Sequence, residues 1–83
     1  MHHQELQEIV NAAKEIYESR LKSDLEHSHM NEFVAIEPQS GDYFLGHSLS
    51  EAVGAARRKH PDRLSHTVRV GHTAAIHFGL TIS

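Results

Sequence analysis

The chain has 83 residues, no cysteine and a formal net charge of −3 with its histidines neutral. A chain this short buries only about 60–65% of its unfolded surface, so we expect a single domain over residues 1–83. The lack of cysteine excludes disulfides and thiolate metal sites, which leaves packing or self-association to stabilise a small core. No apolar run approaches the roughly 18 residues of a membrane helix, and the first residues lack a signal-peptide pattern, so we expect a cytoplasmic protein.

The first predicted element is a long amphipathic helix over residues 4–25. Apolar side chains recur there at three- and four-residue spacing, and neither glycine nor proline interrupts the run. Four residues of this apolar face form a candidate contact surface for the chain's own sheet, for a second copy or for a partner. They are Ile9, Ala13, Ile16 and Tyr17.

A hairpin and a capped helix are predicted next. Residues 33–37 are β-branched and aromatic, residues 38–42 supply turn chemistry, and residues 43–46 form a second strand, which together predict a hairpin over 33–46. Ser48 and Glu51 have the spacing of a capping box, so a helix over residues 48–60 begins there. Its buried face consists mainly of small side chains, and Pro61 ends it.

The last predicted unit is a second hairpin over residues 64–78. Apolar and polar residues alternate from 64 to 70, which predicts a half-buried strand with one face in water. Residues 74–78 form its second strand, and Gly79 begins a tail or a short edge continuation. The order α-β-β-α-β-β therefore predicts a two-layer α+β sandwich, a mainly antiparallel sheet with helices on one face.

The charges are divided unevenly along the chain. Residues 1–51 hold three Lys/Arg and ten Asp/Glu, whereas residues 52–83 hold five and one. We interpret this opposition as two halves that fold against each other; the alternative is two complementary patches that steer a partner. Arg57, Arg58, Lys59 and Arg63 are candidate nucleic-acid contacts, because cations bind phosphates. Cations also favour helix C-termini, however, and no stacking aromatic pattern accompanies the run, so nucleic acid is not the expected partner.

Nine histidines raise the hypothesis of a metal site. They are scattered over every predicted element, without the i, i+4 spacing of a metalloprotease helix. His27 and His29 would project to one side if extended, and His66 could point toward His77 across a hairpin. Surface or half-buried histidines are the preferred interpretation, and no metal or cofactor is predicted. The sequence also lacks a nucleophile elbow and a glycine-rich phosphate loop. Glu37 and Asp42 flank the hairpin turn as a possible acid–base pair, although turn carboxylates are usually solvated.

The sequence EFVAIEPQSGDYFLG at residues 32–46 is followed by LSEA at 49–52, ARRKHPDR at 56–63 and VRVGH at 68–72. These blocks, whose span covers about half of the chain, resemble a family of small uncharacterised bacterial proteins that are often encoded beside a small retropepsin-like aspartic protease. The resemblance implies a protein partner. The strand, loop and LSEA helix start are also similar to HicB-type antitoxins, whose small α+β domain binds and blocks a toxin. We therefore expect a non-enzymatic, homodimeric protein-interaction module, with a nucleic-acid- or metal-linked regulator as the alternative.

Overall fold

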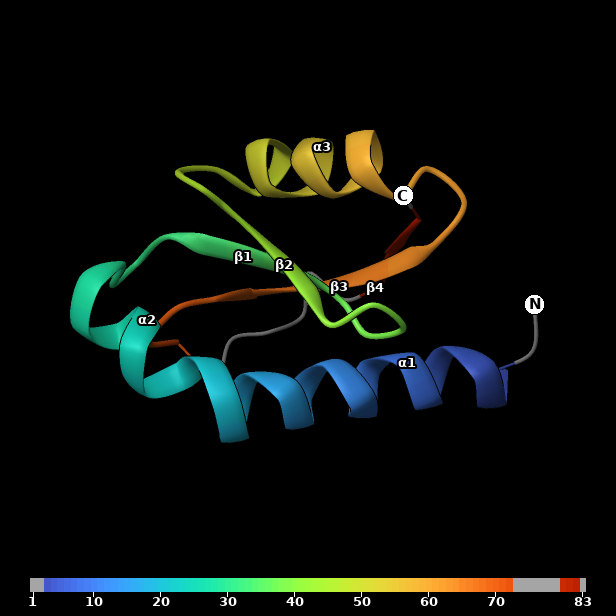
Figure 1. The fold of residues 1–83 in the computed structure, drawn as a ribbon, viewed down its shortest axis with the longest axis horizontal. Helices are drawn as coiled ribbons and strands as arrows, with labels where there is room; N and C mark the ends of the chain where they lie inside the picture. Colours follow the sequence, from blue (N-terminus) through green and yellow to red (C-terminus); the bar gives the residue numbers. More distant parts are fainter. Residues whose placement is uncertain (1–2, 73–79, 83) are drawn as a thin grey trace.

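The computed structural model describes residues 3–72 and 80–82 and shows an antiparallel sheet between two helical layers (Figure 1). The protein is a small α+β domain. The helical elements are α1 (His3–Ile16), the π-helical turn η1 (Tyr17–Leu21), α2 (Lys22–Ser28) and α3 (Leu49–Lys59). The strands are β1 (Phe33–Glu37), β2 (Asp42–Gly46), β3 (Leu64–Arg69) and β4 (Leu80–Ile82). None of the helices in this part of the chain combines the length and apolar character needed to cross a membrane.

The N-terminal helical stretch contains a π-helical turn that the sequence pattern does not predict. Its buried residues Ala13, Tyr17, Leu21 and Leu25 follow one another at intervals of four. Four residues exceed the 3.6 residues of an α-helical turn, so such a row drifts around a regular helix. The wider turn of η1 takes up the excess and returns Leu21 and Leu25 to the core. The stretch then continues through α2 to Ser28, beyond the predicted end at residue 25.

The sheet has the strand order β2-β1-β3-β4, with every neighbouring pair antiparallel. β1 is central: its Ala35 lies opposite Phe44 of β2 on one side and Thr67 of β3 on the other. β4 pairs with the start of β3, from Leu64 to His66. The strand predicted at residues 74–78 lies outside the described residues, and β4 forms where a tail or edge continuation is expected.

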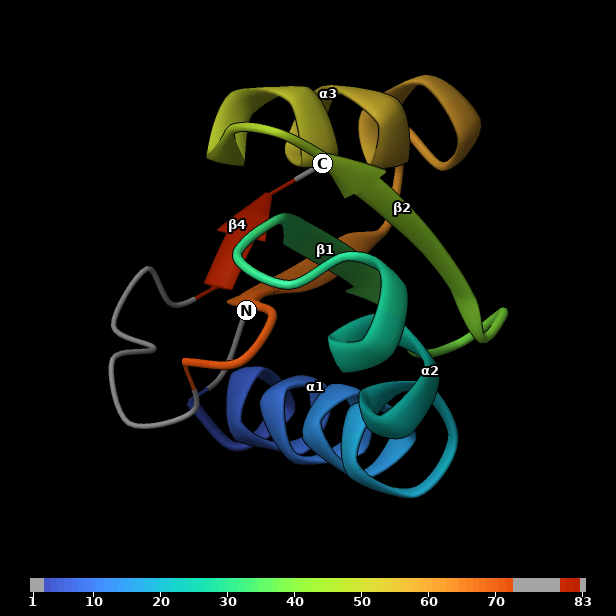
Figure 2. The same ribbon diagram turned by 90° about the vertical axis from the view of Figure 1, so that its left-hand side faces the viewer.

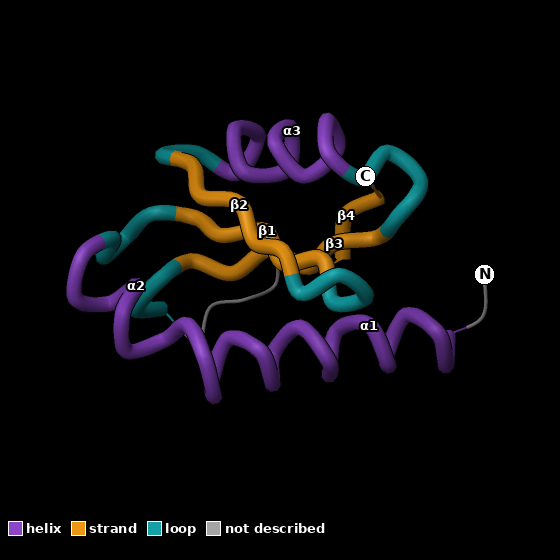
Figure 3. Tube along the Cα trace, viewed as in Figure 1, coloured by secondary structure: helices purple, strands orange, loops and turns teal. Residues whose placement is uncertain are grey.

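The helices lie on opposite faces of the sheet, so the prediction of two layers with helices on one face is wrong (Figures 2 and 3). On one face, residues of α1, η1 and α2 pack against Val34 and Ile36 of β1 and Val68 of β3. On the other face, Ala52 and Ala56 of α3 pack against Ala35. The physical reason is the run Phe33–Glu37, which is apolar on both sides of the strand except at its last residue; such a strand is buried on both faces.

Three polar side chains of β3, those of Ser65, His66 and Thr67, do not face water, contrary to the alternation-based prediction; Arg69 at the end of the strand is partly exposed. Ser65 and Thr67 are fully buried on the α3 side, and His66 is 2% exposed on the α1 side. Alternation in β3 therefore separates two buried faces of different polarity, because the second helical layer covers the face that was expected to be wet.

α3 begins at a side-chain cap and lies very close to the sheet. The Ser48 hydroxyl accepts a hydrogen bond from the Glu51 amide at 3.2 Å, and the Glu51 carboxylate accepts one from the His47 amide at 3.0 Å. A methyl group added at Gly46 in β2 would stand 2.5 Å from the backbone nitrogen of Ala52. Glycine at this position therefore allows the first turn of α3 to sit directly on β2.

Candidate functional site

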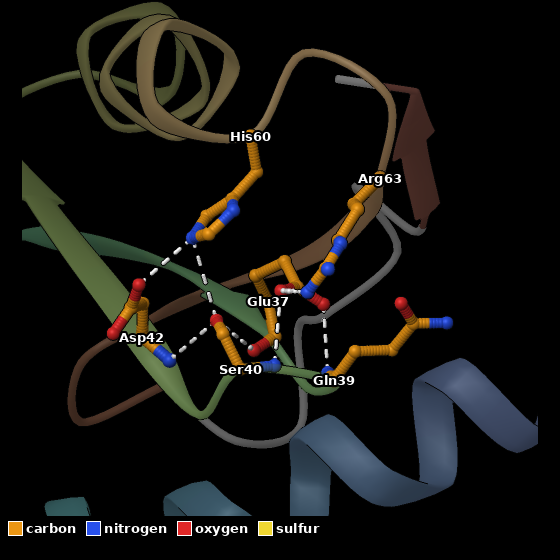
Figure 4. A network of polar contacts seen from close by, with 6 residues as sticks. All are labelled: Glu37, Gln39, Ser40, Asp42, His60 and Arg63. Atoms are coloured by element: carbon orange, nitrogen blue, oxygen red, sulfur yellow. Dashed lines mark hydrogen bonds and ion pairs between the residues drawn. The ribbon is translucent and has the colours of Figure 1, made fainter.

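A network of polar contacts surrounds the turn between β1 and β2 (Figure 4). We call it the turn network; it comprises Glu37, Gln39, Ser40, Asp42, His60 and Arg63. The Glu37 side chain is only 1% exposed. Its carboxylate accepts hydrogen bonds from the backbone amides of Gln39 at 2.7 Å and Ser40 at 3.0 Å, and from Nη1 of Arg63 at 3.2 Å. A buried charge is thereby provided with donors from two parts of the chain.

These donors determine the ionisation of Glu37. Burial alone would raise the pKa of the carboxyl, but the hydrogen bonds from Ser40, Gln39 and Arg63 outweigh burial and leave the pKa below its ordinary value. A general acid or base works best with a pKa near the working pH. Glu37 is instead held as a carboxylate whose oxygens are already occupied, which suits a structural role.

Ser40, His60 and Asp42 are close together but do not form a catalytic triad. Nε2 of His60 lies 2.8 Å from Oδ2 of Asp42 and 3.4 Å from the Ser40 hydroxyl, so both partners meet the same ring nitrogen. In a triad the two ring nitrogens serve different partners, one the nucleophile and the other the carboxylate. The hydrogen bond with His60 lowers the pKa of Asp42 below its ordinary value. Asp42 and Glu37 are both held ionised by separate partners, which argues against the acid–base pair considered from the sequence.

The turn network joins three separate segments of the chain. Glu37 and Asp42 close the hairpin, His60 follows the last residue of α3, and Arg63 immediately precedes β3. The ring of His60 also lies edge-on to Phe44 of β2, with ring centroids 6.1 Å apart. β2 is therefore held by side-chain contacts in addition to its ladder with β1.

The structure divides the predicted basic surface. Arg57, Arg58 and Lys59 are exposed at the C-terminal end of α3. The guanidinium of Arg63 contacts Glu37, and its side chain is 44% exposed. Three of the four candidate cations are thus free to meet a phosphate, whereas Arg63 is engaged in the fold.

The predicted contact surface on the first helix lies mainly in the chain's own core. Ala13 is fully buried and Tyr17 is 2% exposed, and both pack with the strands. Burial raises the pKa of the Tyr17 hydroxyl, and the backbone of Gly71 offsets part of that rise. Ile16 is half-buried against the same core, and Ile9 is half-buried. Ala13 and Tyr17 are therefore unavailable to a partner, because this helix face packs on its own sheet.

A different surface, which the sequence did not single out, is exposed along β2. β2 is the outermost strand on its side of the sheet formed by the described strands. Tyr43 and Leu45 lie opposite Ile36 and Val34 and therefore share the α1 face of the sheet. α1 packs against β3 and β1, and Tyr43 remains 44% exposed. We call this strand, residues 42–46, the β2 edge. The sequence signal was the short run Tyr43-Phe44-Leu45 after the turn, but only the strand order shows that it lies at an edge.

Three histidines each contact a different polar side chain. His29 lies 3.1 Å from Glu32, His60 contacts Asp42, and His72 contacts Asn31. Within residues 3–72 and 80–82, no three His, Asp or Glu side chains are grouped so as to hold a metal ion. The His66/His77 pair cannot be assessed, since His77 lies outside the described residues.

Comparison with known proteins leaves the geometry as the guide to function. The chain shows no significant match to any protein-family model, to any curated protein or to any solved structure. The features that bear on function are therefore the turn network, the β2 edge beside it and the exposed cations of α3.

Proposed function

We propose that the protein is a non-enzymatic protein-interaction module whose contact surface is the β2 edge. The observation that carries this proposal is Tyr43, a large aromatic residue left 44% exposed on an outermost strand. Aromatic residues are enriched at protein interfaces, and an unpaired strand edge offers backbone donors and acceptors to an added strand. The contacts of His60 with Asp42 and Phe44 hold this strand in place before binding.

Rigidity of the edge favours binding over chemistry. A preformed strand loses little conformational entropy when a second strand adds to it, so more of the interaction free energy appears as affinity. The turn network fixes the hairpin end of the strand, and its two carboxylates, Glu37 and Asp42, are each engaged by hydrogen bonds within it. An antitoxin-like role, in which the module covers part of another protein, is one form of this activity.

The candidate partner is the retropepsin-like aspartic protease implied by the sequence resemblance. We expect isothermal titration calorimetry with a retropepsin-like aspartic protease to show binding by the wild-type chain. Tyr43→Lys should weaken that binding at least tenfold, because it places a charge on the edge. Asn11→Lys, the same residue introduced at an exposed position of α1, is the matched control and should bind as the wild type does. Equal binding by all three chains would remove the β2 edge from this role, and no binding by the wild type would remove this partner.

One observation favours a second candidate, nucleic-acid binding: Arg57, Arg58 and Lys59 are exposed together at one helix end. Three phosphate contacts would make the logarithm of the affinity fall with the logarithm of salt concentration with a slope of about −3. Fluorescence anisotropy with a labelled duplex measures this slope. The triple variant Arg57→Ser/Arg58→Ser/Lys59→Ser should show no salt-dependent binding of the duplex. Salt-independent or undetectable binding by the wild type would eliminate nucleic-acid binding as a function.

A further inference from the structure

The β2 edge has the properties of a self-pairing strand. We propose that β2 of one copy adds antiparallel to β2 of a second copy across a two-fold axis at Phe44, so that two four-stranded sheets continue as one. The inference rests on the proposed function, because it names a second copy of this chain as a partner of that same surface. Symmetric two-fold dimers are the commonest protein oligomers.

The first argument is that the residues of β2 themselves carry no device that protects an edge. Soluble proteins guard exposed edges with lysine, proline, bulges or very short strands. β2, with the sequence DYFLG, contains neither lysine nor proline, and its pairing with β1 runs without interruption from Asp42 to Gly46. Its one charged side chain, Asp42, is engaged by His60. Among the described residues, the outermost strand on the other side of the sheet is β4, with three residues.

The second argument is the register that the pleat allows. A two-fold axis perpendicular to the sheet returns each face to itself, so paired residues of the two copies must point to the same face. Side chains alternate between faces along a strand, and the axis must therefore pass through a residue rather than between two residues. An axis at Phe44 pairs all five residues of β2, whereas an axis at Tyr43 or Leu45 leaves strand residues without a strand partner.

The third argument is the chemistry of the pairs formed in that register. On the α1 face, Tyr43 lies opposite Leu45 of the second copy, and the symmetry repeats this pair. On the α3 face, Phe44 lies opposite its own equivalent, and Asp42 lies opposite Gly46. Aromatic–aliphatic and aromatic–aromatic cross-strand pairs are stabilising, and like charges directly opposite would be destabilising. β2 is self-complementary in this register, because no charge of the strand meets a like charge.

Sedimentation velocity tests the association. A five-residue strand pair lies at the small end of stable interfaces, so we expect a dissociation constant of about 10–100 µM. The wild type should shift from the 9.3 kDa monomer toward twice that mass as concentration rises through this range. Tyr43→Lys should remain monomeric, and Asn11→Lys should dimerise as the wild type does. A wild type that stays monomeric well above this range overturns the proposal, as does a Tyr43→Lys chain that dimerises equally well.

Cysteine cross-linking tests the register without relying on a disruptive substitution. The chain has no cysteine of its own, so Tyr43→Cys/Leu45→Cys should give a disulfide-linked dimer on mild oxidation, because the two positions face each other across the axis. Tyr43→Cys alone should not, since residue 43 does not face its own equivalent. Efficient cross-linking of the single variant, or none of the double variant, overturns the register. A wild type that stays monomeric but loses protease binding on Tyr43→Lys would refute the dimer and retain the proposed function. A wild type that dimerises through β2 but binds no protease would retain the dimer and remove the protease as the partner.

Discussion

Replacement of Glu37 by glutamine tests whether the turn network stabilises the fold through a buried charge. The Glu37 side chain is 1% exposed and receives two backbone N–H groups and the Arg63 guanidinium. Glutamine keeps one carbonyl acceptor but turns an NH₂ group toward these donors. Hydrogen bonds to charged groups each contribute about 1.5–3 kcal/mol. Because Arg63 is partly solvated and can turn toward water, we expect the free energy of unfolding to fall by about 2–3 kcal/mol at pH 7.

Such a loss is large for a chain of 83 residues, whose total stability is on the order of 4–12 kcal/mol. Urea unfolding followed by circular dichroism measures it directly. Its pH dependence follows from the lowered pKa of Glu37, whose ordinary value is 4.5. A carboxyl with a lowered folded pKa contributes its full stabilisation above the unfolded pKa and loses it as the pH falls through the folded pKa. The stability of wild type and Glu37→Gln should therefore differ at pH 7 and converge below pH 4.5.

The matched control is Glu18→Gln, which removes a carboxylate that lies 3.4 Å from Lys22 and is 54% exposed. An exposed pair of this kind contributes at most about 1 kcal/mol and commonly less, so its loss should be small at every pH. A Glu37→Gln chain within about 0.5 kcal/mol of the wild type at pH 7, the usual range for surface substitutions, would refute the structural role assigned to the turn network. A difference that persists unchanged at acidic pH would refute the ionised state of Glu37.

Three further substitutions probe how α3 is attached. Ser48→Ala removes the hydroxyl that accepts from the Glu51 amide and should lower the free energy of unfolding by about 1 kcal/mol in urea titrations. Gly46→Ala should cost about 1–3 kcal/mol or prevent folding, seen as a lower melting temperature, because the methyl group meets the backbone of Ala52. Gly54→Ala is its control: the added methyl lies 3.6 Å from the flexible Arg58 side chain, so the better helix propensity of alanine should raise stability by about 0.5–1 kcal/mol, and a decrease in melting temperature would contradict this packing.

Much of the local structure could be predicted because its causes lie within a few residues. The apolar period of the first helix depends on neighbours three and four residues apart. The Ser48–Glu51 cap forms within one turn, as its spacing indicates. The turn between β1 and β2 contains Gly41 at a φ of +80°, a conformation that glycine adopts without strain.

The candidate site was less predictable, because its members come from distant parts of the sequence. Glu37 and Arg63 are 26 residues apart, and no local pattern shows that they meet. The carboxylate expected to be solvated is buried because the start of β3 and its preceding turn lie beside the hairpin. The basic residues 57–63 formed one group in the sequence, but the fold engages Arg63 and leaves the other three exposed.

The sequence by itself determined where the helix around Ala13 and the capped helix after Ser48 begin and which side chains form their apolar faces, since periodicity and capping are local. Tertiary structure decided the rest. Burial of both sides of Ala35 required helices on opposite faces, the row of core residues from Ala13 to Leu25 required a π turn, and the strand order placed β2 at the edge. These outcomes depend on which distant segments pack together. The free energy of that packing cannot be deduced from any short window of residues.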